Sequence, residues 1–120
     1  MAVDPDDIGL TRFHDEDPGG PVVMLNLLRF GDGGFASYQE YARRLRDILP
    51  RYGAKVLYAG SASTVLVGEP DQTWDAVVVV RYPDRDTFGR MVADPGYLDV
   101  ARLRAQALTE TVLQATTPWR

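Results

Sequence analysis

Asn26 is the polar side chain whose position most suggests chemistry. It lies within residues 21–30, where almost every other side chain is apolar. A buried amide without a hydrogen-bond partner costs roughly 1–3 kcal/mol, so a ligand, a catalytic water or a neighbouring protein group must bond it. Asparagine also makes a good oxyanion donor. Asn26 is therefore a candidate catalytic residue, and the alternative that it bonds only to neighbouring protein groups stays open.

Large aromatic and sulfur-containing side chains form a second candidate set. At helical spacing such residues most often belong to a core. Six of them in a chain of 120 residues are nevertheless enough to wall an apolar pocket that carries phenolic groups. Within it, Tyr41 or Tyr97 would donate or relay a proton, and the others would contact a substrate. The six are Tyr38, Tyr41, Trp74, Phe88, Met91 and Tyr97.

Two arginines are candidates for binding an anion. Arg29 and Arg81 lie near the ends of two apolar segments that are predicted to be strands. If these strands are neighbours, the two guanidinium groups would bind a substrate carboxylate. They would otherwise form salt bridges at the rim with Glu110 or Asp75, which is the favoured interpretation because exposed pairs are common and weak.

Metal and thiol chemistry have little support in the sequence. The absence of cysteine excludes disulfides, thiol catalysis and cysteine-bound metals. His14, the one histidine, is followed by Asp15, Glu16 and Asp17. It would act either as a general base or metal ligand on a mobile arm or as a solvated residue of an acidic tail. The second is favoured, because one histidine without cysteine cannot build a typical zinc site. No metal or other cofactor is predicted.

Nucleotides and nucleic acids are also disfavoured. The segment Gly31-x-Gly33-x-x-Ala36 matches the dinucleotide fingerprint superficially, but no acidic residue follows at the end of the next strand to bind a ribose, so a plain turn is preferred. The net charge of −4 and the isoelectric point near 4.8 oppose binding to phosphate backbones. The predicted third strand also lacks the aromatic pattern of an RNA-recognition module.

The spacing of the apolar residues, together with the positions of proline and glycine, predicts the helices and strands that position these residues. Residues 21–30 are apolar on both faces and predict a covered strand. Ser37 and Glu40 fit a capping box at the start of a helix, which Pro50 and Gly53 end. Residues 54–68 are interpreted as one long strand with a bend near Gly60. The interval 69–72, which contains Pro70, would then be a hairpin turn.

The second half of the chain repeats a strand, helix and strand. Residues 74–82 predict the third strand, and Asp84 is placed to cap the helix that follows. Pro95 and Gly96 break this helix, and a second helical piece carries Tyr97, Val100, Ala101 and Leu108. Residues 109–116 are rich in β-forming side chains and predict the closing strand.

This order predicts an α+β fold of the ferredoxin-like βαββαβ type, with a four-stranded antiparallel sheet and both helical regions on one face. The helices can cover one face of the sheet, yet the first and third predicted strands are apolar on both. A symmetric copy of the same sheet is the simplest cover for the second face. The sequence therefore predicts a homodimer.

The chain length suits a single domain. Residues 1–19 are expected to form an N-terminal arm or short helix, and residues 20–118 the folded domain. No apolar run is long enough for a membrane span, and the N-terminus lacks the apolar core of a signal peptide. We therefore expect a cytoplasmic protein with no membrane partner.

The landmarks together resemble the DUF1330 family over about residues 20–118. They are the stretch Pro21-Val22-Val23-Met24-Leu25-Asn26-Leu27-Leu28-Arg29-Phe30, the pair Tyr38 and Tyr41, Tyr52-Gly53-Ala54, Trp74-Asp75-Ala76-Val77, Tyr82-Pro83, Phe88, Met91, Asp94-Pro95-x-Tyr97 and Arg104. The family usually has a histidine directly before the arginine matched by Arg104. This chain has Leu103 there, so any role of that histidine does not carry over.

The resemblance implies a dimeric α/β barrel but no particular reaction. Relatives in that superfamily include cofactor-free monooxygenases, muconolactone isomerases, heme enzymes and stress-response proteins. The expectation is a homodimer that binds a small, partly apolar organic molecule. If it is an enzyme, a cofactor-free monooxygenase, isomerase or cyclase is favoured. Asn26 would then polarise a carbonyl, and Arg104 or Arg81 would neutralise developing charge. The alternative is a non-catalytic ligand sensor or accessory dimer.

Overall fold

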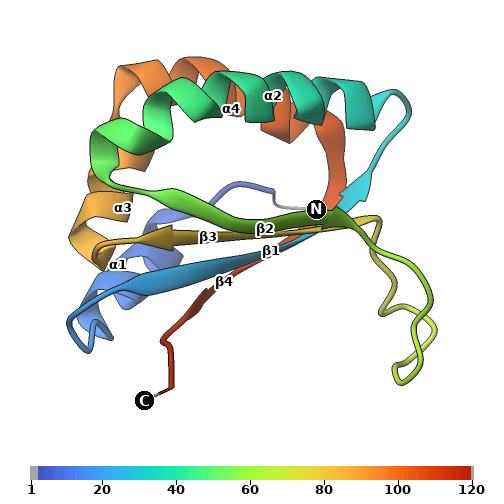
Figure 1. Cartoon of the computed structure of the whole chain (residues 1–120), viewed down its shortest axis with the longest axis horizontal. Helices are drawn as coiled ribbons and strands as arrows, with labels where there is room; N and C mark the ends of the chain where they lie inside the picture. Colours follow the sequence, from blue (N-terminus) through green and yellow to red (C-terminus); the bar gives the residue numbers. More distant parts are fainter. Residues whose placement is uncertain (1–2, 120) are drawn as a thin grey trace.

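The computed structural model describes residues 3–119. Its elements follow the predicted order of strand, helix, strand, strand, helix and strand, with one additional helix at the N-terminus (Figure 1). They are α1 (Asp7–Asp15), β1 (Val22–Phe30), α2 (Gly34–Ile48), the 3-10 turn η1 (Leu49–Tyr52), β2 (Lys55–Ser61), β3 (Ala76–Tyr82), α3 (Arg85–Ala93), α4 (Pro95–Ala107) and β4 (Leu108–Thr116).

The four strands form one antiparallel sheet in the order β2-β3-β1-β4. The long helices α2 and α4 lie side by side over one face of this sheet (Figure 1). The predicted α+β architecture with a four-stranded antiparallel sheet is therefore confirmed. Side chains alternate between the two faces along every strand. The central strands β1 and β3 therefore supply the middle of both faces of the sheet.

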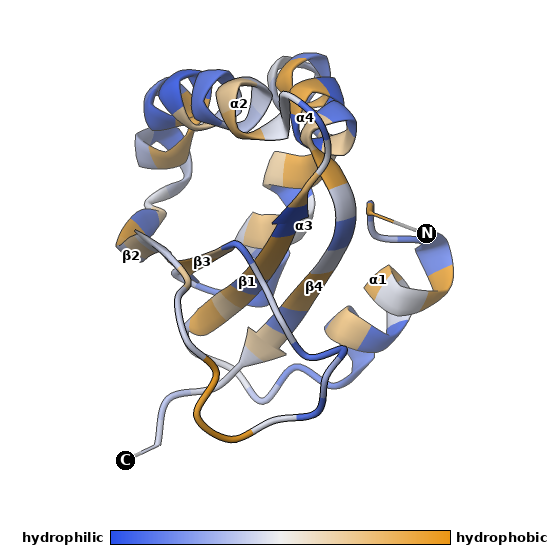
Figure 2. Cartoon of the chain, turned by 90° about the vertical axis from the view of Figure 1, so that its right-hand side faces the viewer, coloured by the Kyte–Doolittle hydropathy of each residue, from blue (hydrophilic) through white to orange (hydrophobic). Residues whose placement is uncertain are grey.

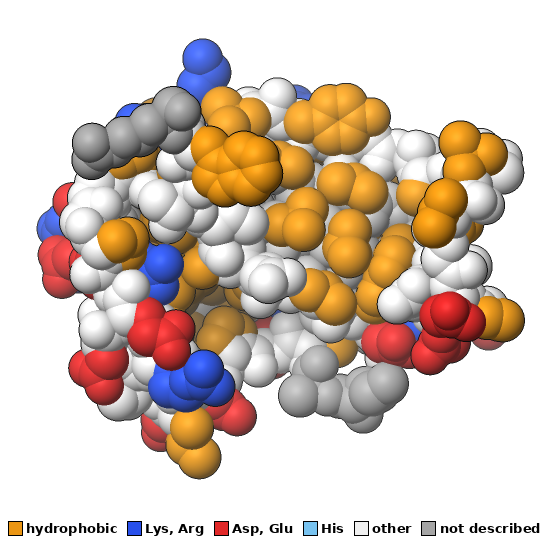
Figure 3. All heavy atoms as spheres, turned by 90° about the horizontal axis from the view of Figure 1, so that it is seen from below, with side chains coloured by type: hydrophobic (Ala, Val, Ile, Leu, Met, Phe, Trp, Pro, Cys, Tyr) orange, Lys and Arg blue, Asp and Glu red, His pale blue; other side chains and the backbone are white. Residues whose placement is uncertain are grey.

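The alternation along β1 separates these faces. Val22, Met24, Asn26 and Leu28 are buried on the side of the helices, whereas the side chains between them are only half-buried. The surface of the sheet away from the helices is apolar over its centre (Figure 3). Its apolar residues are Val23, Leu25, Leu27, Val77, Val79 and Val112, with Tyr58 on the neighbouring edge strand. This set is called the open sheet face below.

The predicted long strand over 54–68 is wrong beyond Ser61. Strand β3 begins only at Ala76, which pairs with Ser61, so the residues between them have no neighbouring strand to bond. They form a loop instead, and its Leu66 and Val67 are almost fully exposed. The start of β2 is also irregular, because the pairing with β3 shifts between Val56 and Tyr58.

The predicted capping box at Ser37 and Glu40 is also wrong. Helix α2 starts three residues earlier, at Gly34, and its N-cap is Gly33 with φ of +68° and no side-chain cap. A Cβ atom on Gly34 would lie 2.2 Å from the carbonyl oxygen of Ala107, so glycine lets the start of α2 touch the end of α4. The side chain of Glu40 instead bonds Arg43 and Arg44 on the same helix.

The predicted cap and the predicted break in the second half are present, but α4 begins at Pro95 itself, and Leu108, which was expected in the helix, starts β4. The Asp84 carboxylate accepts a hydrogen bond of 2.7 Å from the backbone N–H of Thr87 and caps α3. The helical region is then broken before Pro95, as expected. Asp94 begins α4 by accepting a 2.7 Å hydrogen bond from the N–H of Gly96. These short carboxylate contacts satisfy amides that a helix leaves free at its start.

The N-terminal helix α1 lies beside β4 and against α3 (Figure 2). The buried Arg85 holds it there, because its Nη1 donates a 2.8 Å hydrogen bond to the carbonyl of Phe13 and its guanidinium lies over the Phe13 ring. The exposed ring of His14 packs against Gly89. Within the described residues, no group of His, Asp and Glu side chains is arranged to hold a metal ion. None of the described helices is long and apolar enough to cross a membrane.

Candidate functional site

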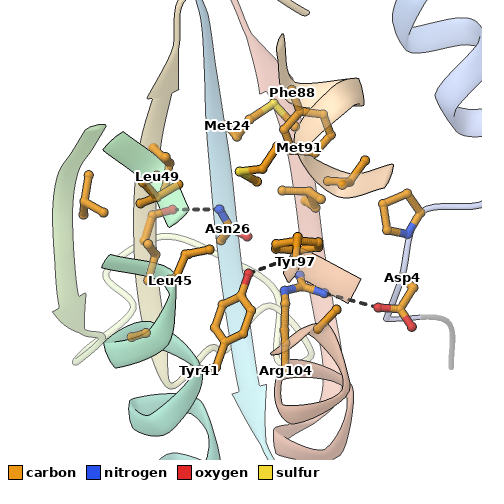
Figure 4. A pocket seen from close by; sticks show the side chains of 18 of the residues that line it. Asp4, Met24, Asn26, Tyr41, Leu45, Leu49, Phe88, Met91, Tyr97 and Arg104 are labelled. Atoms are coloured by element: carbon orange, nitrogen blue, oxygen red, sulfur yellow. Dashed lines mark hydrogen bonds and ion pairs between the residues drawn. The ribbon is translucent and has the colours of Figure 1, made fainter. Parts of the chain in front are cut away.

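A cavity of about 670 Å³ lies between the sheet and the helices (Figure 4). The inner face of β1 and β3 forms one wall, and α2, α3 and α4 form the others. Its surface is mostly apolar, with a small number of polar groups among aliphatic and aromatic side chains. The apolar lining includes Met24, Leu45, Leu49, Val56, Val78, Val80, Phe88, Met91 and Leu113.

Asn26 lies on the β1 wall of this cavity and is 8% exposed. Its Nδ2 donates a hydrogen bond of 3.3 Å to the carbonyl oxygen of Val78. Since a carbonyl can only accept, this bond fixes the orientation of the amide. The Oδ1 atom then points away from Val78 and toward Tyr97 (Figure 4). Asn26 therefore offers the cavity an acceptor, and donation to a substrate carbonyl would depend on its second Nδ2 hydrogen.

Two of the predicted tyrosines are brought together. The hydroxyl groups of Tyr41 on α2 and Tyr97 on α4 lie 3.0 Å apart and share a hydrogen bond. Burial, followed by the neighbouring Tyr97, raises the pKa of Tyr41 well above its ordinary value of 10.0. Tyr41 is therefore a neutral phenol at physiological pH. It can donate a hydrogen bond or a proton, but it cannot act as a base.

Tyr38 and Tyr82 add two more phenols to the cavity wall. Burial raises the pKa of Tyr38 to about 12, although the positive charge of Arg104 opposes this change. Burial raises the pKa of Tyr82 as well. Tyr82 was not among the predicted site residues. Its place at the end of an apolar strand gave no sign that it would reach the cavity.

Arg104 is the charged group at the centre of the site. It extends from α4, lines the cavity and is 4% exposed. Its Nη1 donates a hydrogen bond to the carbonyl of Val3 and lies 4.0 Å from the carboxylate of Asp4. Its Nη2 is buried and has no hydrogen-bond partner among the described residues. A buried charge that is incompletely bonded costs free energy until an acceptor reaches it.

Three of the predicted binding residues, Arg29, Trp74 and Arg81, do not line the cavity. Arg29 and Arg81 extend from the opposite face of the sheet, because each differs by an odd number of residues from an inward side chain on its strand. Arg29 forms a salt bridge with Glu110, bonds the carbonyls of Asp71 and Thr73, and lies over the ring of Trp74. It therefore fixes the loop that precedes β3.

The N-terminal segment contributes residues that the sequence did not single out. Asp4 and Pro5 line the cavity next to α4, and Leu10 of α1 lies near them. These residues precede Arg104 by more than ninety positions in the chain. No local sequence pattern could therefore indicate that the N-terminal segment contacts Arg104. Arg46 and Arg102 also line the cavity, although their side chains are exposed.

The polar groups of the cavity combine one strong cation, several phenolic donors and an amide acceptor. Among the described lining residues, Asp4 is the one carboxylate and no histidine is present. Such a set can bind an organic molecule that has an apolar body and a few oxygen substituents. It can also stabilise negative charge on an oxygen, because Arg104 and neutral phenols are all hydrogen-bond donors.

Comparison with known proteins gives a family profile and several similar structures. The profile of the family described as "Domain of unknown function (DUF1330)" matches residues 34–116. The crystal structure of the protein RPA0582 from Rhodopseudomonas palustris has a TM-score of 0.89 and 29% sequence identity. That alignment covers 98% of this chain and 97% of the other. No curated protein matches the chain.

More distant structures share the fold. The cofactor-independent oxygenase SnoaB from Streptomyces nogalater has a TM-score of 0.61 and 20% identity, over 85% of this chain and 96% of its own. A dimeric protein of ferredoxin-like fold from Bacteroides fragilis has a TM-score of 0.58 and 9% identity, over 80% and 94%. At these identities the likeness concerns the fold alone.

Proposed function

The chain belongs to the DUF1330 family, and from this membership and its cavity we propose that it binds a small, partly apolar organic molecule between the helices and the sheet. The volume of about 670 Å³ falls within the roughly 300–1,000 Å³ typical of ligand pockets.

One observation carries this proposal. The Oδ1 of Asn26, the hydroxyl pair of Tyr41 and Tyr97, and the buried Arg104 come from three different elements and meet at one otherwise apolar cavity. A cavity that served only packing would be filled by side chains, because protein interiors are close-packed. It would also have no reason to keep a guanidinium nitrogen that has no partner among residues 3–119, which is costly when buried.

A homodimer is part of the same proposal. The open sheet face exposes apolar side chains on the two central strands, and water contact with such a surface is unfavourable. A second copy of the chain that packs through this face would remove it from water. A structure of this fold from Bacteroides fragilis is described as dimeric, which supports this choice of partner.

Catalysis is the second candidate function, and the paired phenols favour it. Neutral Tyr41 would pass a proton through the hydroxyl of Tyr97, while Arg104 stabilises negative charge that develops on an oxygen of the substrate. A cofactor-independent isomerase or cyclase could use these groups alone, whereas an oxygenase would also consume O₂ as its oxidant; SnoaB is an oxygenase on the same fold. The rival is a non-catalytic ligand sensor or accessory dimer. The small number of side chains in the cavity that can remove a proton supports this rival, because Asp4 is the one carboxylate and no histidine is present among the described lining residues.

Native mass spectrometry of the purified protein tests the proposal. We expect a dimer with excess mass that disappears on denaturation, because an apolar cavity of this size retains a suitable ligand during purification. Incubation of the complex in air, followed by mass and NMR analysis of the released molecule, separates the two candidates. A changed ligand mass indicates oxygenation, and a changed NMR spectrum at constant mass indicates isomerisation or cyclisation. A molecule that is unchanged in both mass and spectrum favours the sensor or accessory role. A monomeric species would contradict the proposed dimer.

A cavity-filling variant makes the binding test specific. Ala42 lines the cavity from α2, and Ala42→Phe should abolish the excess mass by occupying the space of the ligand. Ala36→Phe, at an exposed position of the same helix, is the matched control and should retain it. Equal ligand retention by both variants would place the bound molecule elsewhere and contradict the proposed site.

A further inference from the structure

We infer that the ligand is an organic carboxylate with an apolar body, and that its carboxylate replaces Asp4 as the counter-ion of Arg104. This inference rests on the proposed function and names the class of molecule that the cavity takes. It follows from the charge of the cavity wall, from the incomplete bonding of Arg104 and from the position of Asp4 on the N-terminal segment.

The cavity wall is positive although the protein is acidic. Its charged residues are Arg46, Arg102, Arg104 and Asp4. Three cations and one anion give a local charge of +2, whereas the whole chain carries −4. Arg104 is the buried member of this set, and its charge acts more strongly than those of the solvent-exposed Arg46 and Arg102. The wall therefore favours the entry of an anion over a neutral or cationic molecule.

Among the described residues, the guanidinium of Arg104 makes one hydrogen bond, which leaves most of its donors without an acceptor. A guanidinium has five N–H donors. In Arg104, one nitrogen bonds the carbonyl of Val3 and another, Nη2, has no partner among the described residues. The carboxylate of Asp4 is at the 4.0 Å limit of an ion pair, and its side chain is 61% exposed. This pair is therefore weak, and the buried positive charge is left largely without compensation.

Asp4 can leave Arg104 without breaking the core. It lies on the segment before α1, and within residues 3–119 its contact with Arg104 is the one ion pair that its side chain makes. Asp4 and Pro5 both line the cavity, so this segment covers the site from the side of α4. A ligand carboxylate would accept hydrogen bonds from the Arg104 fork at normal distance, which is stronger than the present contact. Asp4 then competes with the ligand for one cation.

The rest of the wall specifies the body of this anion. Aliphatic and aromatic side chains require it to be apolar, and the ring edges of Tyr38, Tyr41 and Tyr97 favour a flat, aromatic shape. The free Oδ1 of Asn26 would accept a hydrogen bond from a hydroxyl substituent. The cavity lacks a strong base, which is consistent with a ligand that enters with its acidic proton already removed.

Isothermal titration calorimetry at neutral pH with a matched pair of probes tests the inference. The probes are naphthalene carboxylate and its methyl ester, which share the apolar body and differ in charge. We expect the full-length protein to bind the carboxylate at least about tenfold more tightly, because hydrogen bonds between two charged groups are stronger than those to a neutral ester. Arg104→Gln should remove this preference, whereas Arg90→Gln, at an exposed arginine outside the cavity, should keep it.

Asp4→Asn gives a prediction of opposite sign and involves an exposed residue, so it does not depend on whether the Arg104 variant folds. It should strengthen binding of the carboxylate and leave binding of the ester unchanged, because it removes the competing anion. Asp7→Asn makes the same change of net charge on the exposed first turn of α1 and should have no such effect.

The outcomes distinguish this inference from the proposed function. Ester binding that equals or exceeds carboxylate binding would overturn the inference and leave the proposed function intact. A carboxylate preference that survives Arg104→Gln, or equal effects of Asp4→Asn and Asp7→Asn, would also overturn it. If the wild-type protein binds neither probe, the proposed cavity function fails and the inference fails with it.

Discussion

At the scale of single residues, the cavity is a place where phenols stay protonated. Tyr41 is buried and Tyr38 is partly buried beside it, with the two ring centroids 5.3 Å apart. Burial disfavours the charged phenolate, so the pKa of both is raised. At physiological pH they are therefore neutral hydroxyl groups, which can donate a hydrogen bond to a ligand oxygen or to another phenol and can also accept one.

This protonation predicts a loss of stability in alkaline solution. A phenol in the unfolded chain ionises near its ordinary pKa of 10.0, but Tyr38 in the folded protein ionises only near about 12. Between these values the folded state holds more protons, so the free energy of unfolding decreases as pH rises, by about 1.4 kcal/mol per pH unit for each such group. Below pH 10 the contribution of Tyr38 is fully present.

Urea unfolding at several pH values between neutral and alkaline measures this loss. Tyr38→Phe should make the alkaline slope shallower, because the group that loses its proton only in the unfolded state is gone. The wild-type protein, measured at the same pH values, is the reference. An unchanged slope in Tyr38→Phe would mean that the phenol ionises equally in both states.

At the scale of the elements, the turn between β1 and α2 sets how closely the helices approach the end of the sheet. The backbone N–H of Gly31 donates a 3.0 Å hydrogen bond to the carbonyl of Ala107 at the end of α4. Gly34 lies against the same carbonyl, and Gly33 supplies the left-handed conformation that begins the helix. The glycines thus join the start of α2 to the junction of α4 and β4. They thereby set the relative position of the two helices that carry Tyr41 and Arg104.

Gly34→Ala should therefore destabilise the fold more than Gly33→Ala. The new Cβ at position 34 would meet backbone atoms that cannot rotate away, and a loss of about 2 kcal/mol or more is expected. At position 33 nothing lies within 4 Å, and only the positive φ is unfavourable, at about 1 kcal/mol. Chemical denaturation of both variants gives the comparison. Equal losses would show that the contact with Ala107 relaxes freely.

At the scale of the whole molecule, the two faces of the sheet differ in what covers them. The inner face is covered by this chain's own helices and encloses the cavity. The open sheet face pairs Leu25 with Val79 at its centre, and no element among the described residues covers it (Figure 3). A dimer through this face would place the two cavities on the outside of the paired sheets.

Leu25→Lys should convert the proposed dimer into a monomer. A lysine at the centre of the open sheet face would put a charge into a desolvated interface without a partner, and this is strongly unfavourable. Sedimentation velocity of the variant should give the mass of one chain. Gln39→Lys, at an exposed position of α2, adds the same charge elsewhere and should remain dimeric. A dimer that persists in Leu25→Lys would exclude this face as the interface.

The sequence alone determined the order of elements, the four-stranded sheet and several boundaries. These features follow from local physics. Alternation along β1 decides which side chains share a face, Asp84 caps the helix after it, and Pro95 is tolerated at the first position of a helix but not in its interior, so it starts α4. The same alternation also places Arg29 on the face opposite Asn26. The sequence could therefore have excluded Arg29 from the cavity, had the period of two been applied to it.

Only the tertiary structure decided which cation enters the cavity and what bonds it. Arg104 meets Val3 and Asp4 across more than ninety residues, and no local pattern encodes that contact. The early start of α2 depends likewise on the approach of Gly34 to Ala107, and the end of β2 on where its partner strand begins. Local preferences act over a few residues, whereas such contacts exist only once packing has brought distant segments together.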